Sequence, residues 1–353
     1  MSVMILLVTT YGNSRNGYYE RKLKTTYGTL HLQVPRDRMG KFVQGLIPAH
    51  QQTAGDLETT VIQLYQKGIT TREIGDLIQK MYGHHYSPAT LSNITKRVDK
   101  DVKAFHSRPI KSRYVMLYCD ATFISVRRDS VQKEGLHSII GMDEEGHKEV
   151  LDYALFPSES KENYKEMLQS LKERGLKEVL LFVSDALSGL KDALLEEFPK
   201  GRHQACWMHI NRNVMKHIRA KDKAEVGDDL RLIHQSIDLK AALNNYDKFI
   251  EKWSRRYPEA KQILEKHDNL YTYLTFPKEI QRSLYTNNLI ENFNKRIKKR
   301  TKVKEQFPNE NALDRLVCTI SLEYDERFGN RIHKGFGKVQ AELREMFSGS
   351  DSL

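Results

Sequence analysis

The spacing of hydrophobic and polar residues divides this chain into segments of different period. Within residues 13–40, Leu30, Leu32 and Val34 alternate with polar neighbours, which predicts a β-hairpin arm. Apolar residues in the stretch 55–105 instead recur at helical spacing, in short runs separated by tight turns. The N-terminal part of the chain is therefore expected to form a hairpin arm followed by a small helical module.

Two of the three helices predicted in this module have recognisable N-termini. Thr70 and Glu73 form a capping-box pattern before the second helix, and Ser87 followed by Pro88 starts the third. Three short helices with tight turns are typical of a helix-turn-helix module. Its third helix would offer these polar and basic residues to a DNA groove: Ser92, Asn93, Lys96 and Arg97. A plain three-helix bundle that serves packing or dimerisation fits the same pattern equally well.

From Tyr114 onward the pattern becomes that of an α/β domain. Strands are predicted at residues 115–126, 135–143, 148–156, 179–185 and 202–209, and helices at 161–174 and 189–198. Three strands in a meander, followed by helix, strand, helix and strand, are the element order of a ribonuclease-H-like domain. The charged and mostly helical residues 210–283 look like an all-α insertion into this domain.

A further helix is predicted over residues 285–302, with an apolar stripe on one face. The stripe comprises Leu289, Ile290, Phe293 and Ile297. On the other face Glu291 lines up with three cations, so that one carboxylate stands at the head of a basic row: Lys295, Lys298 and Lys302. An ordinary solvated helix with a Glu–Lys pair, worth about 0.2–0.5 kcal/mol, has the same pattern.

The composition favours a polyanionic partner and a reducing compartment. The chain has 57 Lys+Arg against 46 Asp+Glu, a formal net charge of +11. Its three cysteines are too few and too scattered for a disulfide framework, which indicates a cytoplasmic protein. The apolar run at residues 1–8 is too short for a membrane span and lacks the basic start of a signal peptide, so no membrane association is expected.

Three carboxylates are candidates for a metal site. Asp120 lies within an apolar strand and Asp185 at the end of another, where an unpaired charge is unfavourable. Either residue alone has an ordinary explanation, since Asp185 also stands where a helix could begin. Together with Glu291 they would supply the oxygen ligands that Mg²⁺ or Mn²⁺ prefers, and two such cations can promote an in-line phosphoryl transfer.

Cys206 and His209 have the spacing of half a zinc site. No second half with suitable spacing follows, because Cys318 is isolated. Buried cysteine and hydrogen-bonded histidine are common in protein cores. We therefore expect the pair to support the carboxylate site from a neighbouring strand, or to contact DNA.

The cations that follow Glu291 are expected to bind phosphates, since Lys and Arg contacts to phosphate do not depend on sequence. They are Lys295, Arg296, Lys298, Lys299, Arg300 and Lys302. Lys96 and Arg97 of the helical module are the second candidate DNA-binding group. A nuclear-localisation signal is a weaker interpretation of the basic run, because the run continues the helix that carries Glu291.

Five stretches of this sequence match one family. They are Gly28–Arg38, Cys119–Thr122, Val183–Gly189, Cys206–His209 and Thr286–Arg296. In these stretches the chain resembles the Mutator-type bacterial insertion-sequence transposases, which carry a DDE triad on a ribonuclease-H-like fold. The resemblance covers nearly everything from about Gly12 onward, and the chain is expected to start within the family's N-terminal region. The stretch around Glu291, continued by its basic run, is the most specific of the five.

The resemblance implies a DNA transposase with Asp120, Asp185 and Glu291 as its catalytic, metal-binding residues. It would cleave the ends of an insertion sequence and join them to target DNA by two-metal-ion phosphoryl transfer with Mg²⁺ or Mn²⁺. The implied partners are the terminal inverted repeats and target DNA, bound by a homodimer or a higher synaptic complex at the bacterial nucleoid. Two alternatives remain open: a non-catalytic DNA-binding protein, and a related ribonuclease-H-like nuclease.

The expected fold class is α/β, a ribonuclease-H-like catalytic domain with an all-α insertion, preceded by a helix-turn-helix-like domain. The expected boundaries are residues 1–50 for the arm with its hairpin, 51–108 for the three-helix domain, 109–209 and 284–310 for the catalytic domain, 210–283 for the insertion and 311–353 for a helical tail.

Overall fold

The computed structural model of the chain describes residues 14–25, 28–40, 55–66, 69–83, 85–96, 98–127, 130–157, 160–185, 189–286, 288–302, 306–307 and 309–349. The chain divides into two compact units, residues 1–100 and 101–353, and each is described by itself. Helix α4 (Val98–Ser107) crosses the boundary between them. The apolar run at residues 1–8 lies outside the described residues.

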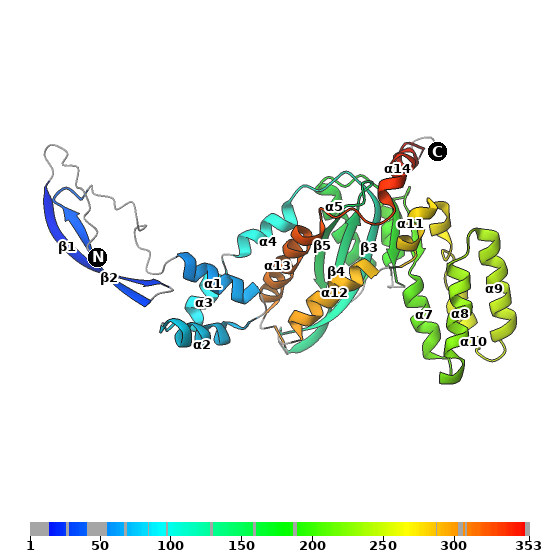
Figure 1. The fold of residues 1–353 in the computed structure, drawn as a ribbon, viewed down its shortest axis with the longest axis horizontal. Coiled ribbons are helices and arrows are strands. Elements are labelled where there is room, and N and C mark those ends of the chain that lie inside the picture. Colours follow the sequence, from blue (N-terminus) through cyan, green and yellow to red (C-terminus); the bar gives the residue numbers. More distant parts are fainter. Residues whose placement is uncertain are drawn as a thin grey trace. The chain divides into compact units, whose positions relative to one another are not determined.

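The smaller unit contains the predicted hairpin and the three predicted helices (Figure 1). Strands β1 (Arg15–Thr25) and β2 (Gly28–Asp37) pair antiparallel. The helices are α1 (Gly55–Gln66), α2 (Thr71–Tyr82) and α3 (Pro88–Thr95). Their apolar faces form one core that includes Leu57, Val61, Ile74, Ile78 and Leu91. The helical spacing of these residues in the sequence is thus explained by their burial.

Both predicted helix N-termini are confirmed. The Thr70 hydroxyl accepts a hydrogen bond from the Glu73 backbone N–H at 3.2 Å, and the Glu73 carboxylate accepts one from the Thr70 N–H at 2.9 Å. Ser87 caps α3 by accepting a hydrogen bond from the backbone N–H of Thr90 at 3.1 Å. These side chains satisfy backbone donors that have no partner inside the helix.

Thr70→Ala is expected to lower the free energy of unfolding of the smaller unit by about 1 kcal/mol, because the hydroxyl that accepts from the Glu73 N–H is lost. Urea unfolding followed by circular dichroism measures the change. Thr71→Ala is the matched control, since the same chemical change is made one residue later, inside the helix. Equal destabilisation by the two variants would contradict the capping role.

The larger unit is built on a five-stranded mixed sheet with the order β5-β4-β3-β6-β7. Its strands are β3 (Arg113–Arg127), β4 (Val131–Met142), β5 (Lys148–Phe156), β6 (Glu178–Ser184) and β7 (Arg202–Ala205). The first three strands pair antiparallel, whereas β6 runs parallel to β3 and β7 parallel to β6. The expectation of an α/β protein is confirmed.

Helices cover both faces of this sheet (Figure 1). Helices α5 (Lys161–Glu173) and α6 (Leu190–Glu197) share one core with sheet residues that include Cys119. Helices α12 (Asn288–Thr301) and α13 (Glu310–Phe328) pack on the opposite face. Successive side chains of a strand point to opposite faces, so Asp120, the neighbour of Cys119, faces α12.

The remaining helices of the larger unit lie mostly between β7 and α12 in the sequence. They are α7 (Trp207–Lys216), η1 (Ala220–Asp222), α8 (Lys223–His234), α9 (Leu239–Trp253), α10 (Pro258–Glu265), η2 (Thr272–Thr275) and α11 (Lys278–Leu284), with α14 (Phe336–Gly349) at the C-terminal end. Each of the helices from α7 to α10 packs against the next one in the chain, and α10 also packs against α7. Among the described residues, no helix combines the length and the apolar character that crossing a bilayer requires.

The predicted fifth strand, residues 202–209, is wrong in its second half. Strand β7 ends at Ala205, and Cys206 is the N-cap of α7. Trp207, Ile210 and Val214 are buried at helical spacing, and the Ile210 N–H donates to the Cys206 carbonyl at 3.1 Å. A short apolar run has the same appearance in a buried strand and in a buried helix, and here the tertiary core selects the helix.

Candidate active site

Asp120 and Asp185 lie side by side because β3 and β6 are neighbouring parallel strands. Cys119 pairs with Ser184 in the ladder, so the next residue of each strand reaches the same end of the sheet. Asp120 is 8% exposed and is still within β3, whereas Asp185 follows the last residue of β6. The pairing of β3 with β6 therefore brings together two carboxylates that are far apart in the sequence.

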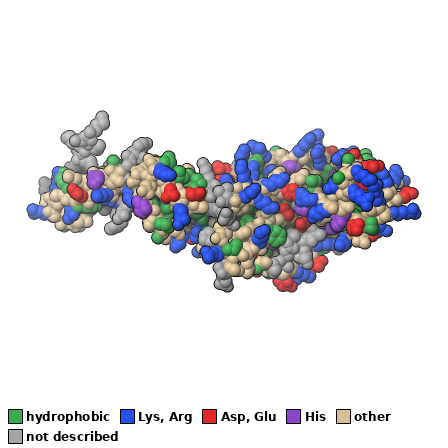
Figure 2. All heavy atoms as spheres, turned by 90° about the horizontal axis from the view of Figure 1, so that it is seen from below, with side chains coloured by type: hydrophobic (Ala, Val, Ile, Leu, Met, Phe, Trp, Pro, Cys, Tyr) green, Lys and Arg blue, Asp and Glu red, His purple; other side chains and the backbone are tan. Residues whose placement is uncertain are grey.

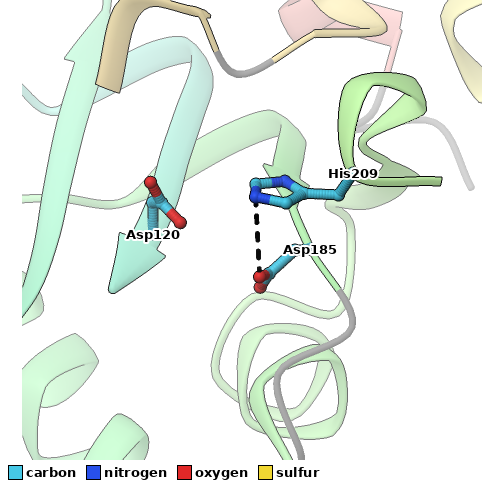
Figure 3. A group of neighbouring side chains, drawn as sticks. All are labelled: Asp120, Asp185 and His209. Atoms are coloured by element: carbon cyan, nitrogen blue, oxygen red, sulfur yellow. Dashed lines mark ion pairs between the residues drawn. The ribbon is translucent and has the colours of Figure 1, made fainter. Parts of the chain in front are cut away.

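His209 completes a compact group with the two aspartates (Figure 3). One possible ligand atom from each of Asp120, Asp185 and His209 lies within 4.8 Å of the others. His209 stands in the first turn of α7, directly after the end of β7, and its Nε2 is 3.9 Å from Asp185 Oδ2. Helix α7 starts directly after the buried Cys206 at the end of β7, and this start sets the place of the imidazole.

Glu291 approaches the same group from α12. Ile290, Phe293 and Ile297 are buried against the core, which leaves Glu291 at the border of the buried face, with 14% of its side chain exposed. Its Oε1 lies 3.9 Å from His209 Nε2 and 3.2 Å from Arg212 Nη2. The carboxylate is thus turned toward α7 and pairs with Arg212 rather than standing on a solvated face.

Asn294 links α12 to β3. Its Nδ2 donates a hydrogen bond to Asp120 Oδ2 at 2.9 Å, and both side chains are buried. Burial raises the pKa of Asp120 to about 6, although the hydrogen bonds from Asn294 and from the Ala121 N–H act against this rise. The negative charge of Glu291 raises the pKa of Asp120 further. The protein thus holds a carboxylate in surroundings that disfavour its charge.

Burial lowers the pKa of His209, with Arg212 and Lys216 adding to the effect and Glu291 opposing it. This favours the neutral imidazole, which can accept a hydrogen bond or bind a metal through one of its two nitrogens.

Sequence reasoning missed Asn294 and Arg212. A signal for each was present, because Asn294 follows Glu291 by three residues and Arg212 follows His209 by three, which places each pair on one helix face. The zinc alternative for Cys206 and His209 gains no support, since neither group of possible metal ligands among the described residues contains a cysteine. The second such group, Asp143, Glu145 and His147, lies at the β4–β5 turn.

The predicted DNA-binding residues on α12 and just after it fall into two groups, exposed lysines and arginines that contact other side chains of the protein. Lys295, Lys298, Lys299 and Lys302 are exposed. Arg296 lies over the Phe328 ring, with 4.7 Å from its Cζ to the ring centroid, and Arg300 pairs with Glu323. In the smaller unit Lys96 is exposed at the end of α3, while Arg97 lies outside the described residues. Figure 2 shows Lys and Arg side chains spread over the larger unit, interspersed with acidic ones.

Asp120→Asn is expected to raise the free energy of unfolding in metal-free buffer by about 2–3 kcal/mol at pH 8. The pKa of Asp120 is raised from 3.8 to about 6 on folding, so its charge destabilises the fold above pH 6. This destabilisation fades as the pH falls through 6 and is nearly gone near pH 4. The new amide can donate to Asn294 Oδ1, a buried oxygen with no hydrogen-bond partner among the described residues.

Urea unfolding at several pH values measures this gain. Asp247→Asn, the same change on the exposed side of α9, is the control and is expected to leave the pH dependence unchanged. A gain at pH 8 that persists undiminished at pH 4 would contradict the electrostatic explanation.

Comparison with known proteins identifies the relatives of the chain. Residues 8–330 match the family described as "Transposase, Mutator family". The chain is 41% identical over 336 residues to the transposase for insertion sequence element IS905 of Lactococcus lactis, covering 95% of this chain and 86% of that protein. The transposase for insertion sequence element IS1201 of Lactobacillus helveticus is 41% identical over 314 residues, covering 89% and 85% of the two chains.

A solved structure, the Drosophila P element transposase strand transfer complex, aligns with 89% of this chain and 88% of its own at 13% identity, with a TM-score of 0.35. The likeness at this score is too slight to support an argument. The family match and the two bacterial relatives cover the four site residues Asp120, Asp185, His209 and Glu291, and confirm the resemblance predicted from the motifs around them. The chain belongs to the Mutator family of transposases.

Proposed function

We propose that this protein is a DDE-type DNA transposase that cleaves the ends of an insertion sequence and joins them to target DNA. The observation that supports this most is the meeting of Asp120, Asp185 and Glu291 around His209, beside the exposed lysines of α12. A carboxylate cluster next to a basic helix suits a reaction at a phosphodiester.

We assign the larger unit to the ribonuclease-H-like class of folds. Three antiparallel strands followed by two parallel ones, with helices on both faces, are consistent with that class. The helices between β7 and α12 would then be the all-α insertion. We keep the smaller unit, with its hairpin and three helices, as the region proposed to recognise DNA through α3.

The donor set fits Mg²⁺ or Mn²⁺. Asp120, Asp185 and Glu291 offer carboxylate oxygens, which both cations prefer, and the imidazole of His209 is better suited to Mn²⁺ than to Mg²⁺. Such cations, when bound, would neutralise the charge that develops on the transferring phosphoryl group. Asn294 would hold Asp120 in place, and Arg212 would hold Glu291.

The other residues would bind and position DNA. Lys295, Lys298, Lys299 and Lys302 would contact backbone phosphates without reading the sequence. End cleavage and strand joining are both phosphoryl transfers that require no covalent protein intermediate, so positioning and charge neutralisation carry the catalysis. Because two ends of an element must be held together, we propose that a homodimer or a larger complex acts at the bacterial nucleoid.

The test uses the purified full chain and DNA that carries the inverted repeats flanking its reading frame. With Mg²⁺ or Mn²⁺ we expect cleavage at the repeat ends and joined products, both abolished by EDTA. Binding without cleavage would favour a non-catalytic DNA-binding protein. Cleavage without joining would favour a ribonuclease-H-like nuclease.

A further inference from the structure

A groove of about 470 Å³ opens beside Asp185, in the size range of sites that bind small ligands. Its walls come from the end of β7, from the C-terminal part of α7 and from the end of α10 with the residues that follow it. The groove therefore lies where the end of β7 meets the helices that follow it. Figure 1 shows where these elements are in the larger unit.

Two cations of the groove have no acidic partner in the part of the chain that the structure describes. Among the described residues, Lys216 of α7 and Lys266 after α10 form no ion pair with a carboxylate, and both are exposed. Lys216 Nζ donates to the Asn213 side chain on its own helix, at 2.9 Å. Two other lysines of this helical region are paired, Lys252 Nζ with Asp229 Oδ2 at 2.7 Å and Lys261 Nζ with Glu265 Oε1 at 3.5 Å. The groove thus contains two lysine charges that no carboxylate of the described residues neutralises.

Two further basic groups of the groove, Lys191 and His203, already have partners. Lys191 Nζ contacts both carboxylate oxygens of Asp268, at 2.7 and 2.9 Å. His203 accepts a hydrogen bond at Nδ1 from the Asn269 amide, so its Nε2 carries the proton and donates to Ser184 Oγ at 2.8 Å. Burial, with a smaller contribution from Lys191, lowers the pKa of His203 to about 4 and keeps it neutral.

Helix α7 connects the groove to the carboxylate group. His209 stands at one end of the helix and Lys216 follows it by seven residues, which brings the two side chains to the same face about 10 Å apart along the axis. That distance is about three nucleotides of a strand at a rise of 3.4 Å each. A strand with one phosphate at the carboxylates can therefore reach Lys216.

We propose that this groove binds the phosphodiester backbone of the DNA strand next to the scissile phosphate, with Lys216 and Lys266 as its phosphate contacts. The inference rests on the proposed function, and it assigns to the helical region a direct part in holding the substrate. The two lysines, which have no carboxylate partner among the described residues, attract a polyanion, and the groove begins at Asp185 of the carboxylate group. His203 and Asn269 form part of its wall. His203 also hydrogen-bonds Ser184, whose hydroxyl donates to the Asp185 carbonyl at 3.0 Å and so helps to hold the backbone at Asp185.

The test measures DNA binding by the full chain in EDTA, where no metal contributes. The probe is a fluorescein-labelled duplex with a single-stranded thymidine tail, and fluorescence anisotropy at several NaCl concentrations gives the affinity and its salt dependence. The Lys216→Glu/Lys266→Glu double variant is expected to bind at least about tenfold more weakly. The slope of log affinity against log salt is expected to fall by about 1.4, the value for two lost phosphate contacts to a single strand.

The Lys216→Gln/Lys266→Gln variant separates loss of charge from reversal of charge and is expected to show the same change of slope with a smaller loss of affinity. Lys240→Glu/Lys248→Glu, on the exposed surface of α9, is the matched control and is expected to bind like the wild type. Wild-type affinity and slope in both groove variants, or equal losses in the control, would overturn the groove proposal and leave the proposed function standing. A wild-type chain that binds no DNA at all would overturn both.

Discussion

Asp185→Asn is expected to abolish end cleavage and strand joining, with a loss of about a thousandfold or more in rate. The change keeps the shape of the side chain and removes the charge of one of the carboxylates that face His209. A neutral amide oxygen is a poor ligand for a hard divalent cation, and loss of several kcal/mol of charge stabilisation corresponds to a rate loss of this size. DNA binding in EDTA is expected to stay within about twofold of the wild type, because the phosphate contacts come from lysines.

Cleavage and joining of DNA that carries the inverted repeats, measured with Mg²⁺ and with Mn²⁺, give the rates. Glu145→Gln makes the equivalent change in the second acidic group, at the β4–β5 turn, and is expected to keep wild-type activity. Cleavage that survives in Asp185→Asn would show that the carboxylates have been assigned wrongly. Loss of activity in Glu145→Gln alone would move the candidate site to that turn.

Trp207→Ala is expected to lower the free energy of unfolding by about 3–5 kcal/mol. Trp207 is fully buried at the start of α7, and its ring stacks on that of His234 with 5.3 Å between centroids. Its indole N–H donates to the Leu270 carbonyl at 2.8 Å. Removal of the ring leaves a cavity and takes away one of the two hydrogen bonds to the Leu270 carbonyl, which keeps the one from Gln204 Nε2 at 3.0 Å. It also loosens the helix that positions His209.

Urea unfolding of the full chain measures this loss. The Trp207→Phe variant separates the effect of the cavity from that of the lost hydrogen bond. Phenylalanine fills much of the cavity but cannot donate to the Leu270 carbonyl, so we expect about 1–3 kcal/mol. Leu243→Ala is the control, because that leucine is 46% exposed on α9 and contributes little to the core. Destabilisation of Trp207→Ala by less than about 1 kcal/mol would mean that α7 is held by other contacts.

Local features of the fold could be predicted because burial leaves a periodic record in the sequence. The alternation of Leu30, Leu32 and Val34 predicts a strand, and the capping box at Thr70 predicts the start of a helix; both are present. The strand predicted over residues 202–209 is wrong from Cys206 onward because this periodic record is missing there. An apolar run of this length has no distinct period until Trp207 is packed into the core.

The candidate site was predicted only in part. Asp120, Asp185 and Glu291 attracted attention because carboxylates beside apolar runs require an explanation. Their distances, the turning of Glu291 toward Arg212 and the hydrogen bond from Asn294 to Asp120 depend on residues far apart in the chain. No period or spacing encodes such contacts.

The sequence by itself determined the order of strands and helices, the surplus of positive charge and the family to which the chain belongs. The tertiary structure alone decided that β6 lies beside β3, that α7 brings His209 between two carboxylates, and that Lys216 and Lys266 line the same groove. The physical reason is that hydrophobicity and its period along the chain are properties of each residue and its near neighbours in the sequence. The approach of two side chains, in contrast, is set by how whole elements pack.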